Sequence, residues 1–416
     1  MKVTSKGLAS TQNPFRPGAG HMPLYLAGRK TETEEFTKLL QQETILQNAI
    51  LTGLRGVGKT VLLETFKPLA LEQGWLWVGT DLSESTSVSE QIFAVRLIAD
   101  LSVATSQIIV GKTKKGGAAY ARSEVGFGKT DNLGHQTLDF EFLCETFAAT
   151  PGLISDKLKA VLELAWVHLS RTEWKGIIFA YDEAQNLSDH ADRHEYPLSL
   201  LLDTFQSIQR KRIPFMLALT GLPTLFPKLV DARTYAERMF HMITLEQLNK
   251  ADSREAIVRP ISLIKCPFNF AEDSIDMIIE DSSGYPYFIQ FICREVFDLW
   301  IQQAKMGKKA SVPREEIIRK LDLDFFAGRY SRTTSRQREL LYIIANLKNG
   351  GKEFAIHDIV SASNEGSAKP FGTSQVNQML NSLIERGLIY KNRYGRYSFA
   401  VPLMGQYILR QGPPKD

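Results

Sequence analysis

The sequence predicts an α/β fold, a three-layer domain with a parallel sheet, followed by an all-helical domain and a C-terminal winged helix-turn-helix. Three observations predict it. The apolar segments 176–181 and 214–220 show no alternation with polar residues, as expected of strands buried on both faces of a parallel sheet. A glycine-rich loop separates an apolar run near Ala49 from an amphipathic segment. From about residue 249 to residue 326 the apolar spacing is wholly helical.

Length and composition limit the class of protein. The 416 residues exceed the size at which one hydrophobic core stops growing, which predicts two or three domains. The hydrophobic share of 44% and the charged share of 23% argue against a disordered or fibrous chain. The three cysteines have no spacing that would hold zinc or a redox disulfide. Since no segment resembles a signal peptide or a membrane span, we expect a cytoplasmic protein with no membrane partner.

Four segments are expected along the chain. Residues 1–22 are rich in Ser, Gly, Pro and Asn, which predicts an extended arm that wraps a surface. Residues 23–248 are expected to form the α/β domain, with a Gly- and Lys-bearing insert at about 106–136 whose length indicates a functional or mobile loop. A helical lid domain at 249–330 and the winged helix domain at 331–416 follow.

A phosphate-binding loop is predicted at residues 53–60, where GLRGVGKT is a complete GxxxxGK[ST] match between a strand and a helix. Glycines let successive N–H groups face phosphate oxygens, and the helix N-terminus adds partial positive charge. Lys59 is expected to neutralise the β- and γ-phosphates of ATP, and Thr60 to give its hydroxyl to Mg²⁺. The expected nucleotide contacts in and after the loop are Gly53, Leu54, Arg55, Gly56, Val57, Gly58, Lys59, Thr60 and Val61.

An acidic pair, Asp182 and Glu183, directly follows the apolar segment 176–181. The pair would lie at the carboxyl edge of the sheet, where ligands bind in such folds. Asp182 is predicted to hold the Mg²⁺ shell and Glu183 to polarise the attacking water. The alternative is a strand end with two solvated acids.

Two more residues are candidates for the reaction. Thr220 ends the segment 214–220, so its hydroxyl would lie at the same edge and touch the γ-phosphate or the water; alternatively it caps the next helix. Arg238 precedes an expected strand at 242–245 and could reach the phosphate of a neighbouring subunit as an arginine finger. A surface ion pair is the alternative for Arg238.

The C-terminal segment has the pattern of a winged helix. Helices are expected at 338–347, 356–361 and 373–385, with Thr373 as the N-cap of the third, and a basic β-hairpin follows from Gly387. The polar face of the third helix would approach base edges of double-stranded DNA, and basic hairpin residues would grip its phosphates. The expected DNA contacts are Ser374, Gln375, Asn377, Lys391, Arg393 and Arg396. Docking to a protein partner is the alternative.

Together these motifs resemble the AAA+ and STAND branch of P-loop ATPases, especially bacterial proteins similar to the origin-recognition ATPases that end in a winged helix. Besides the loop and the acidic pair, the resemblance rests on the segments 28–32, 220–223, 237–238 and 284–286. It implies that the segment 24–29 lies against the adenine, with Arg29 as a nucleotide contact. The segment 284–290 is expected to start a lid helix whose N-terminal turn, with Pro286, faces the nucleotide; the alternative is a helix start within a core, which needs no ligand.

One position departs from the resemblance. Tyr287 stands where initiator-type relatives place an arginine on the γ-phosphate. The glycine-x-proline form at 284–286 is closer to STAND signalling ATPases, which favours a slow nucleotide switch.

Two functions follow from these expectations. The first is an ATPase with ATP and Mg²⁺ as cofactors, which assembles as a nucleotide-dependent homo-oligomer through Arg238 and couples its ATP and ADP states to DNA. The second is a STAND-like regulatory switch whose winged helix docks a protein partner. A small-molecule kinase is disfavoured, because such enzymes usually lack both the acidic pair and a winged helix.

Overall fold

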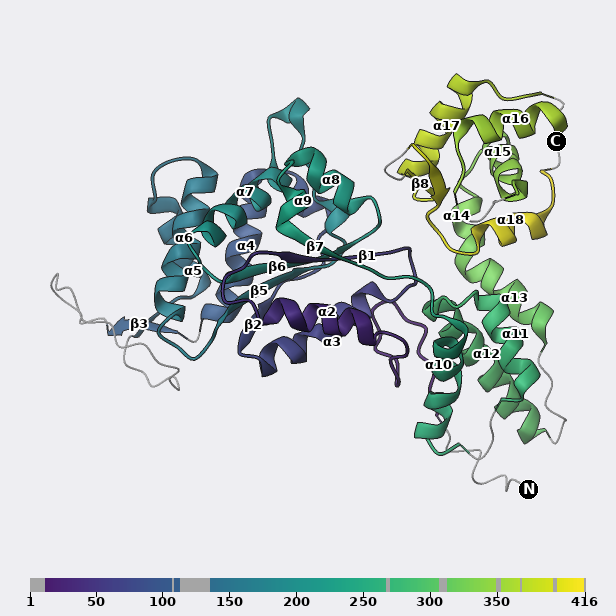
Figure 1. Cartoon of the computed structure of the whole chain (residues 1–416), viewed down its shortest axis with the longest axis horizontal. Coiled ribbons are helices and arrows are strands. Elements are labelled where there is room, and N and C mark those ends of the chain that lie inside the picture. The colour runs from purple at the N-terminus through teal and green to yellow at the C-terminus, as the bar shows by residue number, and fades with distance from the viewer. Residues whose placement is uncertain are drawn as a thin grey trace. The chain divides into compact units, whose positions relative to one another are not determined.

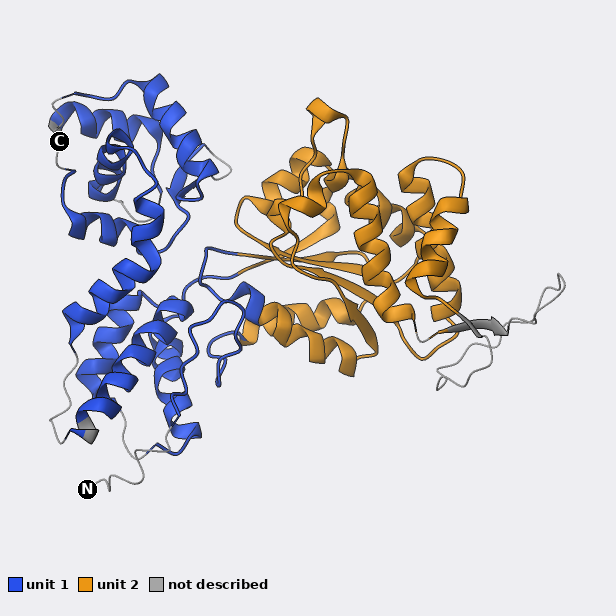
Figure 2. Ribbon diagram, turned by 180° about the vertical axis from the view of Figure 1, so that it is seen from behind, with its two compact units in different colours: residues 1–29, 53–61, 245–416 blue, residues 30–52, 62–244 orange. Residues whose placement is uncertain are grey.

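The computed structural model describes residues 12–106, 108–112, 135–266, 270–306, 313–348, 353–366, 369–391 and 395–414. Figure 2 shows that the chain divides into two compact units. The α/β unit comprises residues 30–52 and 62–244, and the helical unit comprises residues 1–29, 53–61 and 245–416. Each has its own buried apolar core. The four segment boundaries expected from the sequence stay predictions.

A five-stranded parallel sheet forms the centre of the α/β unit, in the order β2-β5-β6-β1-β7. Every residue of β1, β5 and β6 is buried, which explains why their sequences are continuous apolar runs. The strands are β1 (Asn48–Thr52), β2 (Trp75–Val78), β5 (Gly176–Tyr181), β6 (Phe215–Gly221) and β7 (Phe240–Thr244). Pro214 stands outside β6, and its carbonyl accepts from the N–H of Ile177 at 3.1 Å.

Helices cover both faces of this sheet. In Figure 1, α2 and α3 lie on one face and α4 to α9 on the other. Their bounds are α2 (Lys30–Leu40), α3 (Lys59–Glu72), α4 (Glu90–Thr105), α5 (Phe140–Ala149), α6 (Ile154–Leu169), α7 (Pro197–Arg210), α8 (Leu225–Ala232) and α9 (Ala236–Met239). Short 3-10 turns are η1 (Glu84–Ser87), η2 (Ala184–Asn186) and η3 (Ala191–Arg193). The predicted three-layer arrangement is therefore confirmed.

The insert expected at 106–136 is described at its two ends. Strands β3 (Ile109–Lys112) and β4 (His135–Thr137) pair antiparallel there. Residues 113–134 lie outside the described residues.

After residue 245 the helical unit contains α10 (Lys250–Leu263), α11 (Glu272–Ser282), α12 (Pro286–Lys305) and α13 (Arg314–Leu321). The described part of the N-terminal arm packs on these helices. The Asn13 side chain donates to the carbonyl of Arg294 at 3.0 Å. Phe15 is 2% exposed and packs against the rings of Phe270 and Phe297. No helix of the described residues is long and apolar enough to cross a membrane.

The winged helix follows a π-helix, η4 (Asp322–Ala327), and a single turn, α14 (Gly328–Tyr330). It consists of α15 (Ser335–Asn346), α16 (Ile356–Gly366), α17 (Thr373–Glu385), β8 (Ile389–Lys391), β9 (Tyr397–Phe399) and α18 (Met404–Gln411). Strands β8 and β9 form the expected antiparallel hairpin. The predicted fold class, a P-loop α/β domain followed by helical and winged-helix parts, is thus the one observed.

Four details of the winged helix differ from expectation. Helix α15 covers Ser335–Asn346 rather than 338–347, because Thr334 caps it and accepts from the N–H of Gln337 at 3.2 Å. Thr373 is the first residue of α17 rather than its N-cap, because Gly372 has the extended backbone of the cap position. Helix α16 continues to residue 366, since its polar second half still buries Ser363, whose hydroxyl donates to the Val360 carbonyl at 2.8 Å. Helix α18 was not expected; its Tyr407 ring stacks on Phe326 with centroids 5.2 Å apart.

Candidate functional site

The phosphate loop follows β1 directly and leads into α3. Gly56 and Gly58 have φ angles of 81° and 92°, which side-chain-bearing residues rarely adopt. A Cβ on Gly53 would lie 2.5 Å from the carbonyl oxygen of Leu245, so only glycine fits there. The Lys59 ammonium donates to the carbonyls of Gly53 and Leu54 at 3.0 and 3.1 Å, within the curl of the loop. This curled backbone has the shape that binds phosphate.

Two neighbours brace the loop inside the helical unit. Arg29 is 7% exposed, and its guanidinium donates to the carbonyls of Val57 and Glu246 at 2.9 and 2.8 Å. The N–H of Tyr287, just after Pro286, donates to the carbonyl of Gly56 at 3.1 Å. These bonds favour a supporting role for Arg29, while nucleotide contacts of Arg29 and Pro286 stay predictions.

Asp182 and Thr220 meet at the carboxyl edge of the sheet. Both are buried, and Asp182 Oδ1 accepts from the Thr220 hydroxyl and from the N–H of Glu183, the latter at 2.7 Å. Thr220 lies inside β6, and the N-cap of α8 is Thr224. The hydroxyl of Thr220 therefore serves the acidic residue rather than a helix end.

Glu183 adopts a left-handed backbone conformation, with φ 51° and ψ 34°. Such a conformation costs about 1–3 kcal/mol for a non-glycine residue and persists where surrounding contacts hold it, often at functional sites. Its carboxylate accepts a hydrogen bond from the side chain of Gln185. Surrounding contacts therefore hold Glu183 in this backbone conformation at the carboxyl edge of the sheet.

Asp81 is a third carboxylate at this edge that sequence reasoning missed. It follows β2 and pairs with Asp182 in an isolated parallel bridge, in which the N–H of Leu82 donates to the Asp182 carbonyl at 2.9 Å. Burial raises the pKa of Asp81, and the negative charges of Asp182 and Glu183 raise it further. Only the pairing of β2 with β5, which are about a hundred residues apart in sequence, brings these acids together.

Arg238 lies on α9 with an exposed side chain, and it makes no ion pair with any described residue.

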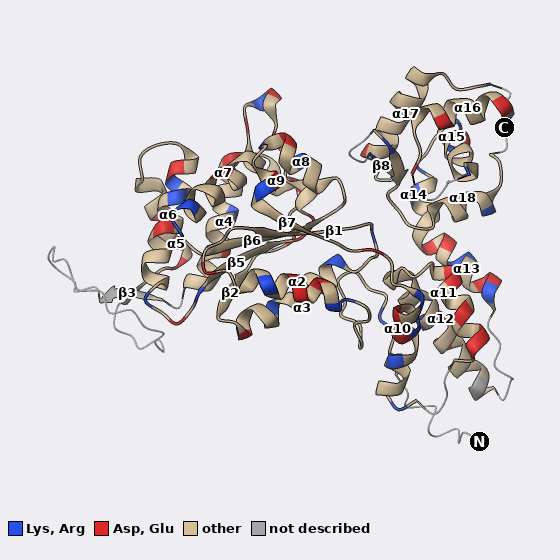
Figure 3. Ribbon diagram, in the orientation of Figure 1, with Lys and Arg blue, Asp and Glu red and all other residues tan. Residues whose placement is uncertain are grey.

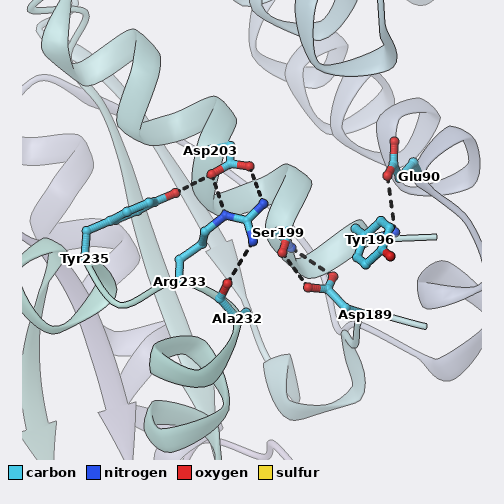
Figure 4. A network of polar contacts seen from close by, with 8 residues as sticks. All are labelled: Glu90, Asp189, Tyr196, Ser199, Asp203, Ala232, Arg233 and Tyr235. Atoms are coloured by element: carbon cyan, nitrogen blue, oxygen red, sulfur yellow. Dashed lines mark hydrogen bonds and ion pairs between the residues drawn. The ribbon is translucent and has the colours of Figure 1, made fainter. Parts of the chain in front are cut away.

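A polar network holds the turn before α9, as Figure 4 shows. Arg233 binds Asp203 with two hydrogen bonds of 2.8 and 2.7 Å, and the Tyr235 hydroxyl donates to the same carboxylate at 2.6 Å. Burial alone would raise the pKa of Asp203, but these hydrogen bonds outweigh it and lower the pKa.

In the winged helix, Ser374, Gln375 and Asn377 are all exposed on α17. Figure 3 shows α17 almost without charged residues. Lys391 is exposed, and Arg396 lies 3.9 Å from Asp358 as an ion pair. Arg393 lies outside the described residues.

Comparisons with known proteins agree with this fold. Residues 323–408 match a domain family of unknown function, DUF8462. A Walker-type ATPase of Pyrococcus abyssi is similar in structure, with 15% identity, a TM-score of 0.54, and coverage of 92% of this chain and 96% of that chain. The ADP form of the Aeropyrum pernix ORC2 protein has 13% identity, a TM-score of 0.51, and coverage of 95% and 97%. No curated protein matches the sequence. At these identities the structural likeness establishes the fold.

Proposed function

We propose that this chain binds and hydrolyses ATP and couples its nucleotide state to DNA through the winged helix. The arrangement of three adjacent strands carries the proposal. Strand β1 ends at Thr52, immediately before the phosphate loop, β6 carries Thr220, and β5 ends immediately before Asp182. Their register pairs Thr52 with Gly221 and Tyr181 with Leu219. The motifs therefore follow neighbouring strands at one edge, where ligands bind in open α/β sheets.

Each residue has a role in the proposed reaction. Lys59 neutralises phosphate charge, and Glu183 accepts the proton of the attacking water. Thr60 and Asp182 would hold Mg²⁺, which would supply positive charge to the β- and γ-phosphates. Their hydroxyl and carboxylate oxygens are ligands that Mg²⁺ prefers, and Mg²⁺ needs only one or two from the protein when phosphates supply others.

Titration with a fluorescent ATP analogue tests nucleotide binding. We expect Lys59→Ala to weaken binding at least tenfold, because it removes the charge that faces the phosphates. Lys67→Ala is a matched control, since Lys67 is exposed two turns further along α3. Equal affinities for the wild type and Lys59→Ala would exclude the proposed phosphate site.

DNA coupling rests on the exposed polar face of α17 and the basic hairpin that follows it. ATP turnover should rise with duplex DNA at low salt and respond less at moderate salt, because phosphate contacts release counterions. Neutralising Lys391, Arg393 and Arg396 together should remove the response, and Lys348→Ala, an exposed control on the same domain, should keep it. An ATP turnover rate that is the same with and without DNA at low salt would instead favour the second candidate function.

That second candidate is a nucleotide-dependent switch whose winged helix docks a protein partner. A chain of contacts within the helical unit favours it. Tyr287 bonds to the phosphate loop through its N–H, and its ring packs 5.1 Å from that of Phe325 in the π-helix before the winged helix. π-Helical turns often mark functional positions. Limited proteolysis tests this candidate. The rate of cleavage within residues 322–334 should differ between the ATP-bound and the ADP-bound protein if the chain is a switch, and equal rates would exclude it.

Assembly through Arg238 is also a proposal. The exposed side chain on α9 would reach the phosphates of a second copy and stabilise the transition state in trans. Mixing Arg238→Ala and Lys59→Ala chains, each inactive alone, should restore turnover, because a Lys59→Ala chain still supplies Arg238 to the intact phosphate site of an Arg238→Ala chain. No recovery on mixing would exclude action in trans.

A further inference from the structure

Gln185 lies two residues after the proposed base and contacts three parts of the α/β unit. Its amide group donates to the Glu183 carboxylate. Its amide oxygen accepts from the N–H of Leu222, just after β6, at 3.1 Å. Its backbone carbonyl accepts from the Lys228 ammonium at 2.6 Å. The amide nitrogen of Gln185 is thus bonded to the proposed base, and its amide oxygen is bonded to the turn between β6 and α8.

The orientation of this amide follows from hydrogen-bond chemistry. A backbone N–H can only donate, and an ionised carboxylate can only accept. The oxygen must therefore face Leu222, and the nitrogen must face Glu183. No other flip of the amide satisfies both neighbours, so the pair of bonds is directional.

Lys228 fastens this segment to α8. Its ammonium also donates to the Ser188 hydroxyl at 2.5 Å, and it makes no ion pair in the described parts of the chain. Burial lowers the pKa of Lys228, although the charge of Asp189 acts the other way. A half-buried cation costs solvation free energy unless hydrogen bonds compensate it. Here the compensation comes from the segment that follows the proposed base.

The same helix leads to Arg238. Helix α8 ends at Ala232, and the bonds from Arg233 and Tyr235 to Asp203 fix the turn between α8 and α9 on α7. Two partners of Gln185, Leu222 and Lys228, therefore belong with the exposed Arg238 to one continuous segment, 222–239, which contains α8 and α9. A displacement of that segment would move the Leu222 N–H and the Lys228 ammonium together.

We propose that Gln185 is a positioning residue for Glu183 and couples it to the segment that carries Arg238. This inference rests on the proposed ATPase function. Surrounding contacts must hold the left-handed backbone of Glu183, and Gln185 supplies a hydrogen bond to the carboxylate that this backbone carries. Through Lys228 and Gln185, a contact that a neighbouring subunit makes with Arg238 would be linked to the carboxylate that activates water.

Steady-state turnover and ATP-analogue affinity of the full chain test this coupling. Gln185→Met keeps the side-chain length and loses the two side-chain hydrogen bonds, to Glu183 and to the N–H of Leu222. Gln185→Glu keeps the acceptor for Leu222 but replaces the donor with a charge that repels Glu183. We expect both to lower kcat at least tenfold, with the Kd for the analogue and the melting temperature close to wild type. Gln206→Met, on the partly exposed side of α7, is the matched control and should behave as wild type.

Lys228→Met tests the coupling to α8. It should lower kcat less than Gln185→Met at unchanged affinity. The double variant should be no slower than Gln185→Met alone, because Lys228 acts through Gln185. Multiplying fold-changes in the double variant would overturn the coupling.

The outcomes separate this inference from the function on which it rests. If the wild type binds ATP but releases no phosphate, the proposed hydrolysis is wrong and the inference falls with it. If the wild type turns over and Gln185→Met matches it, hydrolysis stands and the positioning role is overturned. A loss of affinity or melting temperature in proportion to kcat would assign Gln185 a general structural role and likewise overturn it.

Discussion

Replacing Tyr181 with phenylalanine removes one hydrogen bond from the residue that precedes the acidic pair. The Tyr181 hydroxyl donates to Asp100 Oδ2 at 2.8 Å, and Arg96 binds the same oxygen at 3.0 Å. Tyr181 is 0% exposed and Asp100 is 2% exposed. Burial and the nearby charge of Asp100 raise the pKa of Tyr181 well above its ordinary value, so the phenol stays protonated and remains a donor.

The expected cost of Tyr181→Phe follows from these contacts. A hydrogen bond to a charged group contributes about 1.5–3 kcal/mol, and the ring leaves no cavity when only the oxygen is lost. For a unit of roughly 200 residues, about 2 kcal/mol corresponds to a melting temperature lower by about 4–8 °C. Differential scanning calorimetry should show this shift in the transition of the α/β unit.

A matched control separates the hydrogen bond from a general effect of losing a hydroxyl. The backbone N–H of Tyr196 donates to the Glu90 carboxylate (Figure 4), and the residue is 37% exposed. Its hydroxyl bonds to none of the described residues, so Tyr196→Phe should leave the melting temperature within about 1 °C of wild type. Equal melting temperatures for Tyr181→Phe and Tyr196→Phe would refute the reasoning.

Three further predictions concern charge and burial. The pKa of Asp81 is raised above its ordinary 3.8, so ionisation of this carboxyl destabilises the folded state as pH rises. Asp81→Asn should therefore raise the urea midpoint at pH 7. The gain should vanish when the pH is lowered below 3.8, where Asp81 is protonated in both the folded and the unfolded chain. The pKa of Asp203 is lowered, so the ionised carboxylate stabilises the folded state above pH 3.8 and this contribution is lost as the pH falls further. Arg233→Met should lower the free energy of unfolding by about 1 kcal/mol at pH 7, and the loss should become smaller below pH 3.8. Thr204 buries a hydroxyl that has no partner among the described residues, so Thr204→Val should leave stability equal or raise it by up to about 1 kcal/mol in urea unfolding.

Local signals predicted much of this fold. The segment 176–181 is β5 itself, because a strand buried on both faces must be apolar throughout. The phosphate loop was readable because its function requires glycines and a lysine at fixed spacing. Helix α17 has the predicted bounds 373–385, since its apolar side chains recur with helical spacing.

Other features depend on contacts between residues far apart in sequence. Asp81 follows a strand with no motif of its own, and only the β2–β5 pairing brings it to Asp182. Gln185 and Lys228 are polar residues of ordinary type whose meeting depends on how α8 packs. Helix α18 is short, and the burial of Met404 and Tyr407 in the core that it shares with the rest of the winged helix explains it better than propensity does.

Single-turnover hydrolysis of radiolabelled ATP by the wild type and by Glu183→Gln tests the central claim most directly. The account predicts that the wild type forms ADP and phosphate in the presence of Mg²⁺. Glu183→Gln should bind ATP with unchanged affinity and hydrolyse it at least about 100-fold more slowly, because the amide cannot accept the proton of the attacking water. Equal rates for the two proteins would contradict the assignment of Glu183 as the base, and the absence of any product from the wild type would contradict the proposed ATPase.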